Sequence, residues 1–313
     1  MNLQQLEYLI AVDKTGSFSK AADLCFVTQA TLSTMVKRLE EELDVVLFDR
    51  SSSPVLTTDA ARPVIELAQK AVAAVNGIRE VSGLMKGKVE GRIKLGVIPT
   101  VANSVLPLIM KSLLEKYPDL VLEIREITTQ SILKQLKSGE IDAGLLSTPV
   151  KEGDGFVEQV LYYEALFVYG TPVSNVKKFV MPKEIVKEKI WLLEEGHCLR
   201  EQFVNLCSLK KKRMGDQLIF ESNSFDTLLN MADEFGGLTV LPELYVRSMS
   251  PERKKKVFQF VAPYPVREIS LMVSRPFVKS RLVQVLAEEI KSMILPLLIT
   301  ESIKKSDQVI VRS

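Results

Sequence analysis

The chain has 313 residues, of which 46% are hydrophobic and 26% are charged, and its formal net charge is +2. This length and composition predict two or three globular domains, and the balanced charge gives no support for nucleic-acid binding through a general basic field. No stretch of 18 residues is free of charge, and the first residues, MNLQQLEYLI, lack the basic-then-apolar pattern of a secretion signal. We therefore expect a cytoplasmic protein that does not bind membranes.

Scarce chemical groups gather between residues 194 and 207, where EEGHCLREQFVNLC holds the single histidine, His197, and two of the three cysteines. In a reducing compartment these thiols are not expected to form a permanent bridge. One histidine without a C-x-x-C pattern cannot supply the usual zinc ligands, so we expect neither a metal nor a cofactor. Cys198 and Cys207 are then either buried packing groups or a sensor thiol and its partner, whereas Cys25, in ADLCFV, is expected to pack in a core.

Residues 1–60 are predicted to form three helices. Apolar residues recur at helical spacing over residues 3–13, Gly16 and Ser17 end that helix, a second helix follows, and Thr28 has the side chain to cap a third. The third helix has an apolar stripe and a polar, partly basic opposite arc. The segment carries five basic and nine acidic residues, a formal charge of −4, so DNA contacts must come from the placement of a few cations. A generic three-helix core and a helix-turn-helix both fit this pattern.

The stretch LEYLIAVDKTGSFSKAADLCFVTQATLSTMVKRLEEELDVVLFDR, residues 6–50, resembles the winged helix-turn-helix of LysR-type transcriptional regulators almost continuously. The resemblance implies that the third helix enters the major groove of double-stranded promoter DNA. The residues implied to lie nearest base edges or phosphates are Thr28, Gln29, Thr31, Ser33, Thr34, Lys37, Arg38 and Arg50. Asp44 and Ala61 stand where the family usually has glycine, and the wing SSSPVL has no cation, which favours few phosphate contacts and a shallow salt dependence.

Residues 61–90 are predicted to form a linker helix and a hinge. An apolar seam repeats at alternating spacings of four and three residues over Val64, Ala68, Ala71, Val75, Ile78, Ser82 and Met85. A long helix packed on its own domain would show the same pattern, but the LysR family uses this segment for dimerisation. We expect a homo-oligomer, from dimer to tetramer, with DNA half-sites about 34 to 36 Å apart or multiples of that spacing. Gly83, Gly87 and Gly91 are expected to form the hinge.

Beyond the hinge, strand-like runs alternate with helical runs, which is typical of an α/β fold with parallel strands. Ligands in such folds bind at the carboxyl ends of strands, where Thr100 and Thr129 are expected. The same alternation of strands and helices would suit a periplasmic binding protein or a small enzyme. No secretion signal supports the first, and no nucleophile elbow or G-x-G-x-x-G motif supports the second. The family resemblance implies a two-lobed, periplasmic-binding-protein-like regulatory domain over residues 91–300. Lobe I is expected at about 91–163 and 268–300, lobe II at about 164–267, and a flexible tail at 301–313.

Within the family, GHCLREQ at residues 196–202, the second cysteine nine positions after the first, GVIPT, Thr129 and LLNM at 228–231 resemble the peroxide-sensing OxyR group. This resemblance implies that Cys198 is the peroxidatic thiol and Cys207 the resolving thiol. It nominates five residues around the peroxide or the thiol: Thr100, Thr129, His197, Arg200 and Arg267. Hydrogen peroxide, RNA polymerase and a reductant such as glutaredoxin or thioredoxin are the implied partners, and the protein is expected not to be an enzyme.

Geometry adds an expectation of its own. If the segment between the two cysteines is helical, nine residues separate the Cα atoms by about 13 Å and turn the side chains to opposite faces. Because a disulfide needs Cα atoms within about 7 Å, its formation would require the local backbone to refold. Two other functions stay open, a LysR-type regulator that binds a small metabolite between the lobes and a thiol peroxidase.

Overall fold

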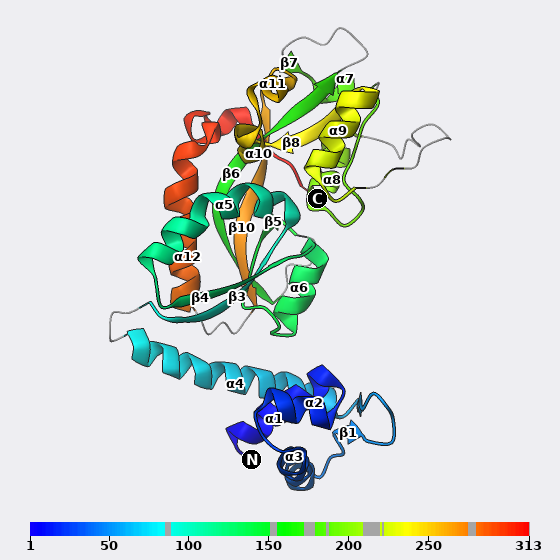
Figure 1. The fold of residues 1–313 in the computed structure, drawn as a ribbon, viewed down its shortest axis with the longest axis vertical. Helices are drawn as coiled ribbons and strands as arrows, with labels where there is room; N and C mark the ends of the chain where they lie inside the picture. Colours follow the sequence, from blue (N-terminus) through cyan, green and yellow to red (C-terminus); the bar gives the residue numbers. More distant parts are fainter. Residues whose placement is uncertain are drawn as a thin grey trace. The chain divides into compact units, whose positions relative to one another are not determined.

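The computed structural model describes residues 1–84, 89–150, 155–171, 179–185, 188–208, 220, 222–274 and 280–312. The chain divides into two compact units (Figure 1), a head unit that ends at residue 88 and a regulatory unit that begins at residue 89. The head unit contains α1 (Leu3–Thr15), α2 (Phe18–Leu24), α3 (Gln29–Leu43), β1 (Phe48–Asp49), β2 (Leu56–Thr57) and α4 (Ala61–Leu84).

Local sequence signals explain the helices of the head. Asn2 accepts a hydrogen bond from the Gln5 amide and forms a capping box at the start of α1. Thr28 caps α3 by accepting from the Thr31 amide, as predicted. The α3 stripe Leu32, Val36 and Leu39 is fully buried. The antiparallel pair β1–β2 forms the wing, so the winged helix-turn-helix prediction is confirmed.

Asp44 ends α3 in the left-handed conformation, with φ 53° and ψ 40°. Asparagine, aspartate and glycine are the residues that adopt this conformation at lowest cost. Asp44 therefore ends the helix in a conformation that aspartate adopts at low cost.

Helix α4 begins on the head and continues away from its core. Its buried side chains are Ala61, Ile65 and Ala68. Farther along, Ile78 is 71% exposed. Val64 and Val72 also pack against the head core, whereas the predicted seam leaves the apolar side chain of Ile78 uncovered. The Ser82 side chain, Met85 and Gly87 lie outside the described residues.

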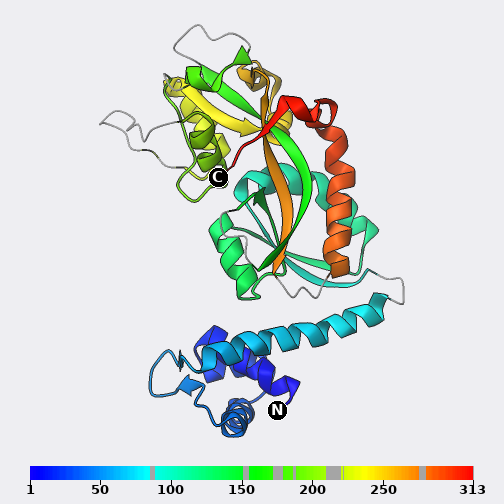
Figure 2. The same cartoon turned by 180° about the vertical axis from the view of Figure 1, so that it is seen from behind.

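The regulatory unit is a mixed α/β structure built on a nine-stranded sheet (Figures 1 and 2). Lobe I contains β3 (Gly91–Val97), α5 (Pro99–Lys116), β4 (Leu120–Glu126), α6 (Thr129–Lys137), β5 (Ala143–Thr148) and α12 (Ser280–Ile294). Lobe II contains β7 (Phe179–Val180), α7 (Pro182–Ile185), α8 (Cys198–Leu206), α9 (Phe225–Phe235), β8 (Gly237–Pro242), α10 (Glu243–Ser248), α11 (Pro251–Lys254) and β9 (Val257–Phe260). Strands β3, β4 and β5 are parallel, as the alternating pattern predicted.

Two long antiparallel strands, β6 (Phe156–Thr171) and β10 (Tyr264–Ser274), pass through both lobes. β5 pairs with β10 over Glu268–Met272, whereas β8 pairs with β6 over Leu166–Thr171. The lobe boundaries predicted at about residues 163–164 and 267–268 lie within these two strands. The sequence pattern did not predict β10 as a strand. Conversely, KIWLL at residues 189–193, one of the strand-like runs of the sequence, contributes only an isolated bridge, between Ile190 and Leu238.

The expected flexible tail at 301–313 is wrong for residues 308–312. After η1 (Leu295–Leu297), η2 (Ile299–Ser302) and η3 (Lys305–Asp307), the strand β11 (Gln308–Ile310) pairs in parallel with β10. Val311, 5% exposed, joins the lobe II core. The prediction weighed the charged residues of this segment and overlooked the β-branched run VIV, whose side chains favour a strand.

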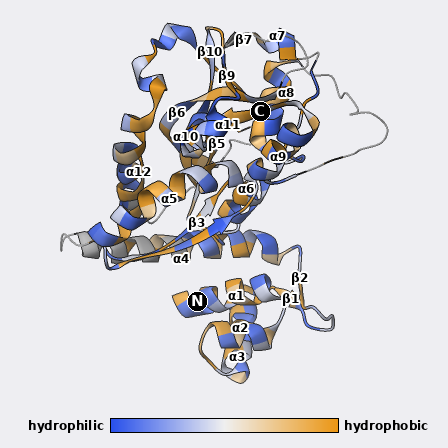
Figure 3. Ribbon diagram, turned by 45° about the horizontal axis from the view of Figure 1, so that its top comes forward, coloured by the Kyte–Doolittle hydropathy of each residue, from blue (hydrophilic) through white to orange (hydrophobic). Residues whose placement is uncertain are grey.

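Hydropathy is distributed along the helices as in amphipathic elements, with orange and blue residues alternating on most of them (Figure 3). Among the described residues, no helix combines the length and apolar character needed to cross a membrane.

Candidate functional site

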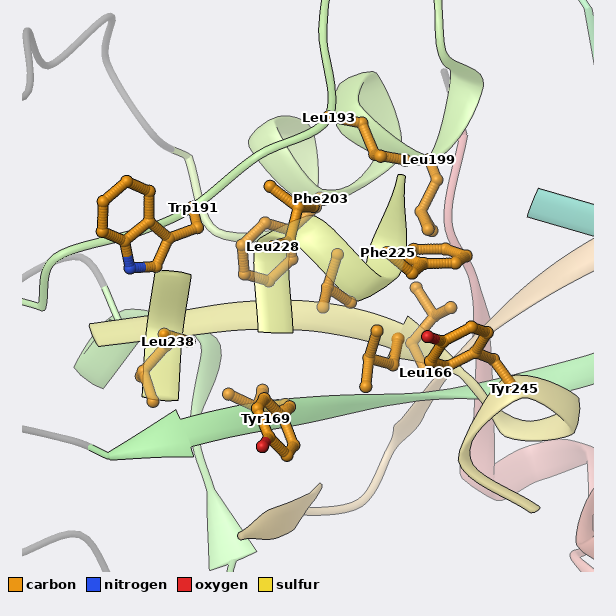
Figure 4. Close-up of a cluster of buried hydrophobic side chains, with 14 of the residues drawn as sticks. Leu166, Tyr169, Trp191, Leu193, Leu199, Phe203, Phe225, Leu228, Leu238 and Tyr245 are labelled. Atoms are coloured by element: carbon orange, nitrogen blue, oxygen red, sulfur yellow. The ribbon is translucent and has the colours of Figure 1, made fainter. Parts of the chain in front are cut away.

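Cys198 is the first residue of α8, and the packing of this helix fixes the position of its thiol. Leu199 and Phe203, one helical turn apart, pack into the lobe II core (Figure 4). Cys207, which follows the helix, belongs to the same core. Cys198 is not part of that cluster, although it is only 7% exposed. The two thiols, both free, therefore have different surroundings.

Several polar groups act on the Cys198 sulfur. The Thr129 hydroxyl, the backbone N–H groups of Leu199 and Ser147 and the charge of Arg267 all favour its ionised form. Burial nevertheless raises the pKa of Cys198 above its ordinary value. The Thr129 hydroxyl oxygen is buried and has no hydrogen-bond partner among the described residues. These groups are therefore available to stabilise negative charge at or beside the sulfur.

Arg267 is held by a network that is completely buried. Its Nε and NH2 groups lie 2.8 and 2.6 Å from Oε1 of Glu164, and both side chains are 0% exposed. NH1 donates to Thr100 Oγ1 at 2.9 Å, and NH2 donates to the Thr100 carbonyl at 3.1 Å. The alternative of a surface ion pair for Arg267 is therefore wrong. Glu164 keeps the cation next to the thiol and partly neutralises its charge.

Three helices begin at residues of this cluster. Thr100 is in the first turn of α5, Thr129 is the first residue of α6, and Cys198 is the first residue of α8. The free N–H groups and the partial positive charge of a helix are concentrated at its start. The cluster therefore suits an anion, or an oxygen atom that becomes negative during a reaction.

His197 and Arg200 take different positions. His197 is 4% exposed, and its Nε2 lies 2.9 Å from Oδ1 of Asn223, so Nε2 carries the proton because the amide oxygen accepts. Arg200 donates to the Leu193 carbonyl at 2.6 Å and lies 3.9 Å from Glu195. Its guanidinium is thus engaged by these oxygens, and the cation that lowers the pKa of Cys198 is Arg267.

Cys207 is inert in this conformation. It is 3% exposed, and burial raises the pKa of its thiol to about 12. Because α8 spans Cys198–Leu206, the helical rise places the two cysteine Cα atoms about 13 Å apart, beyond the limit of about 7 Å for a disulfide. A bond between the two sulfurs would require both unwinding of α8 and removal of Cys207 from the core.

Three residues of this network were missed in the sequence. Ser147 is the last residue but one of β5, so the rule that ligands bind at the carboxyl ends of strands would have found it. Gln202 lies one turn after Cys198, is 0% exposed, and donates to Ser147 Oγ at 2.9 Å. No pattern in the sequence around Glu164 indicated that this residue belongs to the network. Among the described residues, no group of His, Cys, Asp and Glu side chains could hold a metal ion.

The candidate DNA-binding face lies on α3 and the wing. Exposed side chains there are Thr28, Gln29, Thr31, Thr34, Lys37, Arg38 and Arg50, with Ser33 partly exposed. Arg50 is restrained, since it lies 2.7 Å from Glu40 and its guanidinium carbon lies 4.7 Å from the centre of the Phe18 ring. Glu40 also accepts from the Leu47 and Phe48 amides, so this ion pair joins α3 to the wing.

Known proteins share this architecture. Residues 3–62 match the bacterial regulatory helix-turn-helix protein, lysR family, and residues 86–294 match the LysR substrate binding domain. The chain belongs to the LysR family of transcription regulators, with an N-terminal helix-turn-helix domain that binds DNA.

Within that family, the relatives include OxyR proteins. The chain is 35% identical over 281 residues to "DNA-binding transcriptional dual regulator OxyR" of Escherichia coli (strain K12), covering 88% of this chain and 90% of that one. It is 30% identical over 302 residues to the "Hydrogen peroxide-inducible genes activator" of Haemophilus influenzae, covering 94% of this chain and 99% of that protein. A full-length OxyR cysteine-to-aspartate variant from Pseudomonas aeruginosa superposes with a TM-score of 0.77 at 30% identity, covering 93% of this chain and 98% of that one.

Proposed function

We propose that this LysR-family regulator senses hydrogen peroxide through Cys198 and converts the oxidation into a change of promoter binding. The observation that carries the proposal is the buried Cys198 thiol at the start of α8, together with the buried Arg267 and, at the start of α6, a buried Thr129 hydroxyl that has no partner among the described residues. Relatives named as hydrogen peroxide-inducible genes activators support it.

The chemistry follows from these groups. The Cys198 sulfur attacks one peroxide oxygen, the O–O bond breaks, and the departing oxygen leaves as water after taking up the thiol proton, which gives a sulfenic acid. Thiolate formation alone accounts for little of the rate, because complete ionisation of an ordinary thiol gains only about tenfold. Donors aimed at the leaving oxygen must provide the rest, and Thr129 and the helix starts are the groups available.

The second step links chemistry to structure. The Cys207 thiol attacks the sulfenic sulfur, a second water leaves, and the Cys198–Cys207 disulfide closes. Since α8 separates the two residues, the bridge forms only if this helix unwinds and Cys207 leaves the core. A disulfide contributes about 2 to 4 kcal/mol, which is enough to shift a two-state assembly between its forms.

The readout is the arrangement of DNA-binding heads in a homo-oligomer. Exposed Ile78 on α4 supports a partner helix along the predicted seam. A changed arrangement of subunits would alter the spacing of the heads on promoter DNA, and with it the contact to RNA polymerase. Glutaredoxin or thioredoxin would return the disulfide to two thiols.

Mass spectrometry with one equivalent of hydrogen peroxide tests the proposal. The wild-type chain should lose two hydrogens between Cys198 and Cys207, Cys207→Ser should stop at a sulfenic acid that dimedone traps, and Cys198→Ser should stay unmodified. Cys25→Ser is the matched control and should behave as wild type, because Cys25 lies in the head. Footprinting of promoter DNA should then differ between reduced and oxidised protein. A footprint and thiol state that peroxide leaves unchanged would refute the proposal.

A further inference from the structure

The segment at residues 308–312, here called the latch segment, binds to lobe II. In β11, Gln308, Val309 and Ile310 pair in parallel with Tyr264, Pro265 and Val266 of β10. The Val311 amide adds a bond to the Val266 carbonyl at 2.9 Å, and its side chain enters the core that contains Leu199 and Phe203 of α8. Figures 1 and 2 show this last segment of the chain next to α8.

Helix α8 holds the latch segment through two side-chain amides. Gln202 Nε2 donates to the Val311 carbonyl at 3.2 Å, and Asn205 Nδ2 donates to the Arg312 carbonyl at 3.1 Å. Residues three apart on a helix lie on one face, about 4.5 Å apart along its axis. Unwinding of α8 would change the spacing and direction of these two amides, so both contacts to the neighbouring Val311 and Arg312 carbonyls depend on the helical form of α8.

The same glutamine lies next to the thiol site. Gln202 is one turn after Cys198 on α8, and its Nε2 also donates to Ser147 Oγ at 2.9 Å. Both Gln202 and Ser147 are 0% exposed, so water does not substitute for this contact. The latch segment is therefore bonded to the same helix that begins with the reactive thiol.

We propose that residues 308–312 form a redox-sensitive latch, which binds lobe II while α8 is helical and is released when the Cys198–Cys207 disulfide forms. This inference rests on the proposed function. Because the latch binds the dithiol form and not the disulfide form, it stabilises the former by its own binding free energy. The latch therefore determines how oxidising the surroundings must be before the disulfide form of the protein predominates.

The reaction that measures this bias is exchange with glutathione, in which the protein disulfide and two glutathione thiols give the protein dithiol and one glutathione disulfide. Deleting residues 308–313 should raise the ratio [GSH]²/[GSSG] at the midpoint about tenfold, which corresponds to a potential about 30 mV more negative. The rate of sulfenic acid formation in a Cys207→Ser background should change by less than about twofold, since the deletion removes no group that touches the sulfur.

Two point variants provide a matched pair. Val311→Asp places a charge where the side chain is 5% exposed and should act like the deletion, whereas Val309→Asp, at a position 40% exposed, should keep the wild-type midpoint. Thermal unfolding of each reduced variant identifies a chain that has failed to fold. If a variant fails to fold, hydrogen exchange on the wild-type chain tests the latch instead.

Hydrogen exchange on the wild-type chain provides that measurement. In the reduced form the Val311 amide should be protected by its bond to Val266, and oxidation should abolish this protection while the amides of the β10 segment paired with β5 stay protected. A disulfide that forms while Val311 keeps its protection, or equal midpoints for the deletion and the wild type, would overturn the latch alone. If no disulfide forms in the intact chain, the proposed function and the latch fail together.

Discussion

Arg267 and Glu164 are register partners on β10 and β6, at the point where these strands cross from one lobe to the other, and they form an ion pair that no solvent reaches. Removing one partner of such a pair leaves a buried charge without compensation. The pair therefore links the electrostatics of the Cys198 thiol to the junction between the lobes.

Glu164→Gln should lower the pKa of Cys198. The carboxylate partly cancels the charge of Arg267, which holds that pKa down, so its loss lets the cation act more fully on the sulfur. Alkylation of Cys198 at pH 7 should become several-fold faster in a background without Cys25 and Cys207, and stability should fall by about 1 to 3 kcal/mol. Glu243→Gln, another buried carboxylate, should leave the alkylation profile unchanged.

Thr129→Val should slow the reaction with peroxide. The change removes a hydroxyl that lowers the pKa of Cys198, so that pKa rises, and it removes a donor for the leaving oxygen. We expect the second-order rate of sulfenic acid formation to fall about 10- to 100-fold. Thr239→Val is the matched control, because its hydroxyl is also buried without a partner among the described residues but lies on β8. Equal rates for the two variants would contradict the role of Thr129.

Cys207 should make the reduced protein less stable in alkali. Its pKa is about 12 when folded and near 8.5 when unfolded, so between these values the folded chain binds more protons and stability falls as pH rises. The stabilising contribution is complete below the unfolded pKa and is lost toward the folded one, at no more than about 1.4 kcal/mol per pH unit. With reductant present, urea unfolding between pH 8.5 and 10 should show a shallower decline for Cys207→Ala than for wild type.

The two arginines of the DNA-binding face should behave differently. Arg38→Ala should weaken binding to all DNA sequences and reduce the slope of log affinity against log salt by about 0.9, as expected for one phosphate contact. Arg50→Ala should also destabilise the head, by roughly 1 kcal/mol, because Arg50 pairs with Glu40 and packs over Phe18. Fluorescence titrations across salt concentrations, together with thermal unfolding, separate the two effects.

The sequence predicted those features that depend on residues only a few positions apart, such as helix caps and apolar stripes. Thr28 was predicted as a helix cap because capping depends on a bond to a residue only three positions away, and it makes that bond to Thr31. The apolar stripe of α3 was predicted for the same reason. Cys198 was also expected next to a helical segment, and α8 begins at that residue.

Long-range contacts explain what the sequence could not predict. Glu164 and Arg267 lie 103 positions apart and become neighbours only through the pairing of β6 with β10. Since β10 is buried along most of its length, it lacks the alternation of polar and apolar residues by which a half-exposed strand is found. The latch segment carries the β-branched run VIV, which favours a strand, but its docking partners on β10 and at Gln202 lie far away in the sequence.

The helix starts around Cys198 also set an upper limit to the useful dose of oxidant. A second peroxide molecule converts a sulfenic acid to a sulfinate, an anion that the same N–H groups, the Thr129 hydroxyl and Arg267 would stabilise. In the proposed sensor, opening of α8 must therefore be faster than this second oxidation, because sulfinate at Cys198 can no longer bond to Cys207. At high peroxide concentrations a growing share of the molecules would hold a sulfinate at Cys198 and would no longer form the Cys198–Cys207 disulfide.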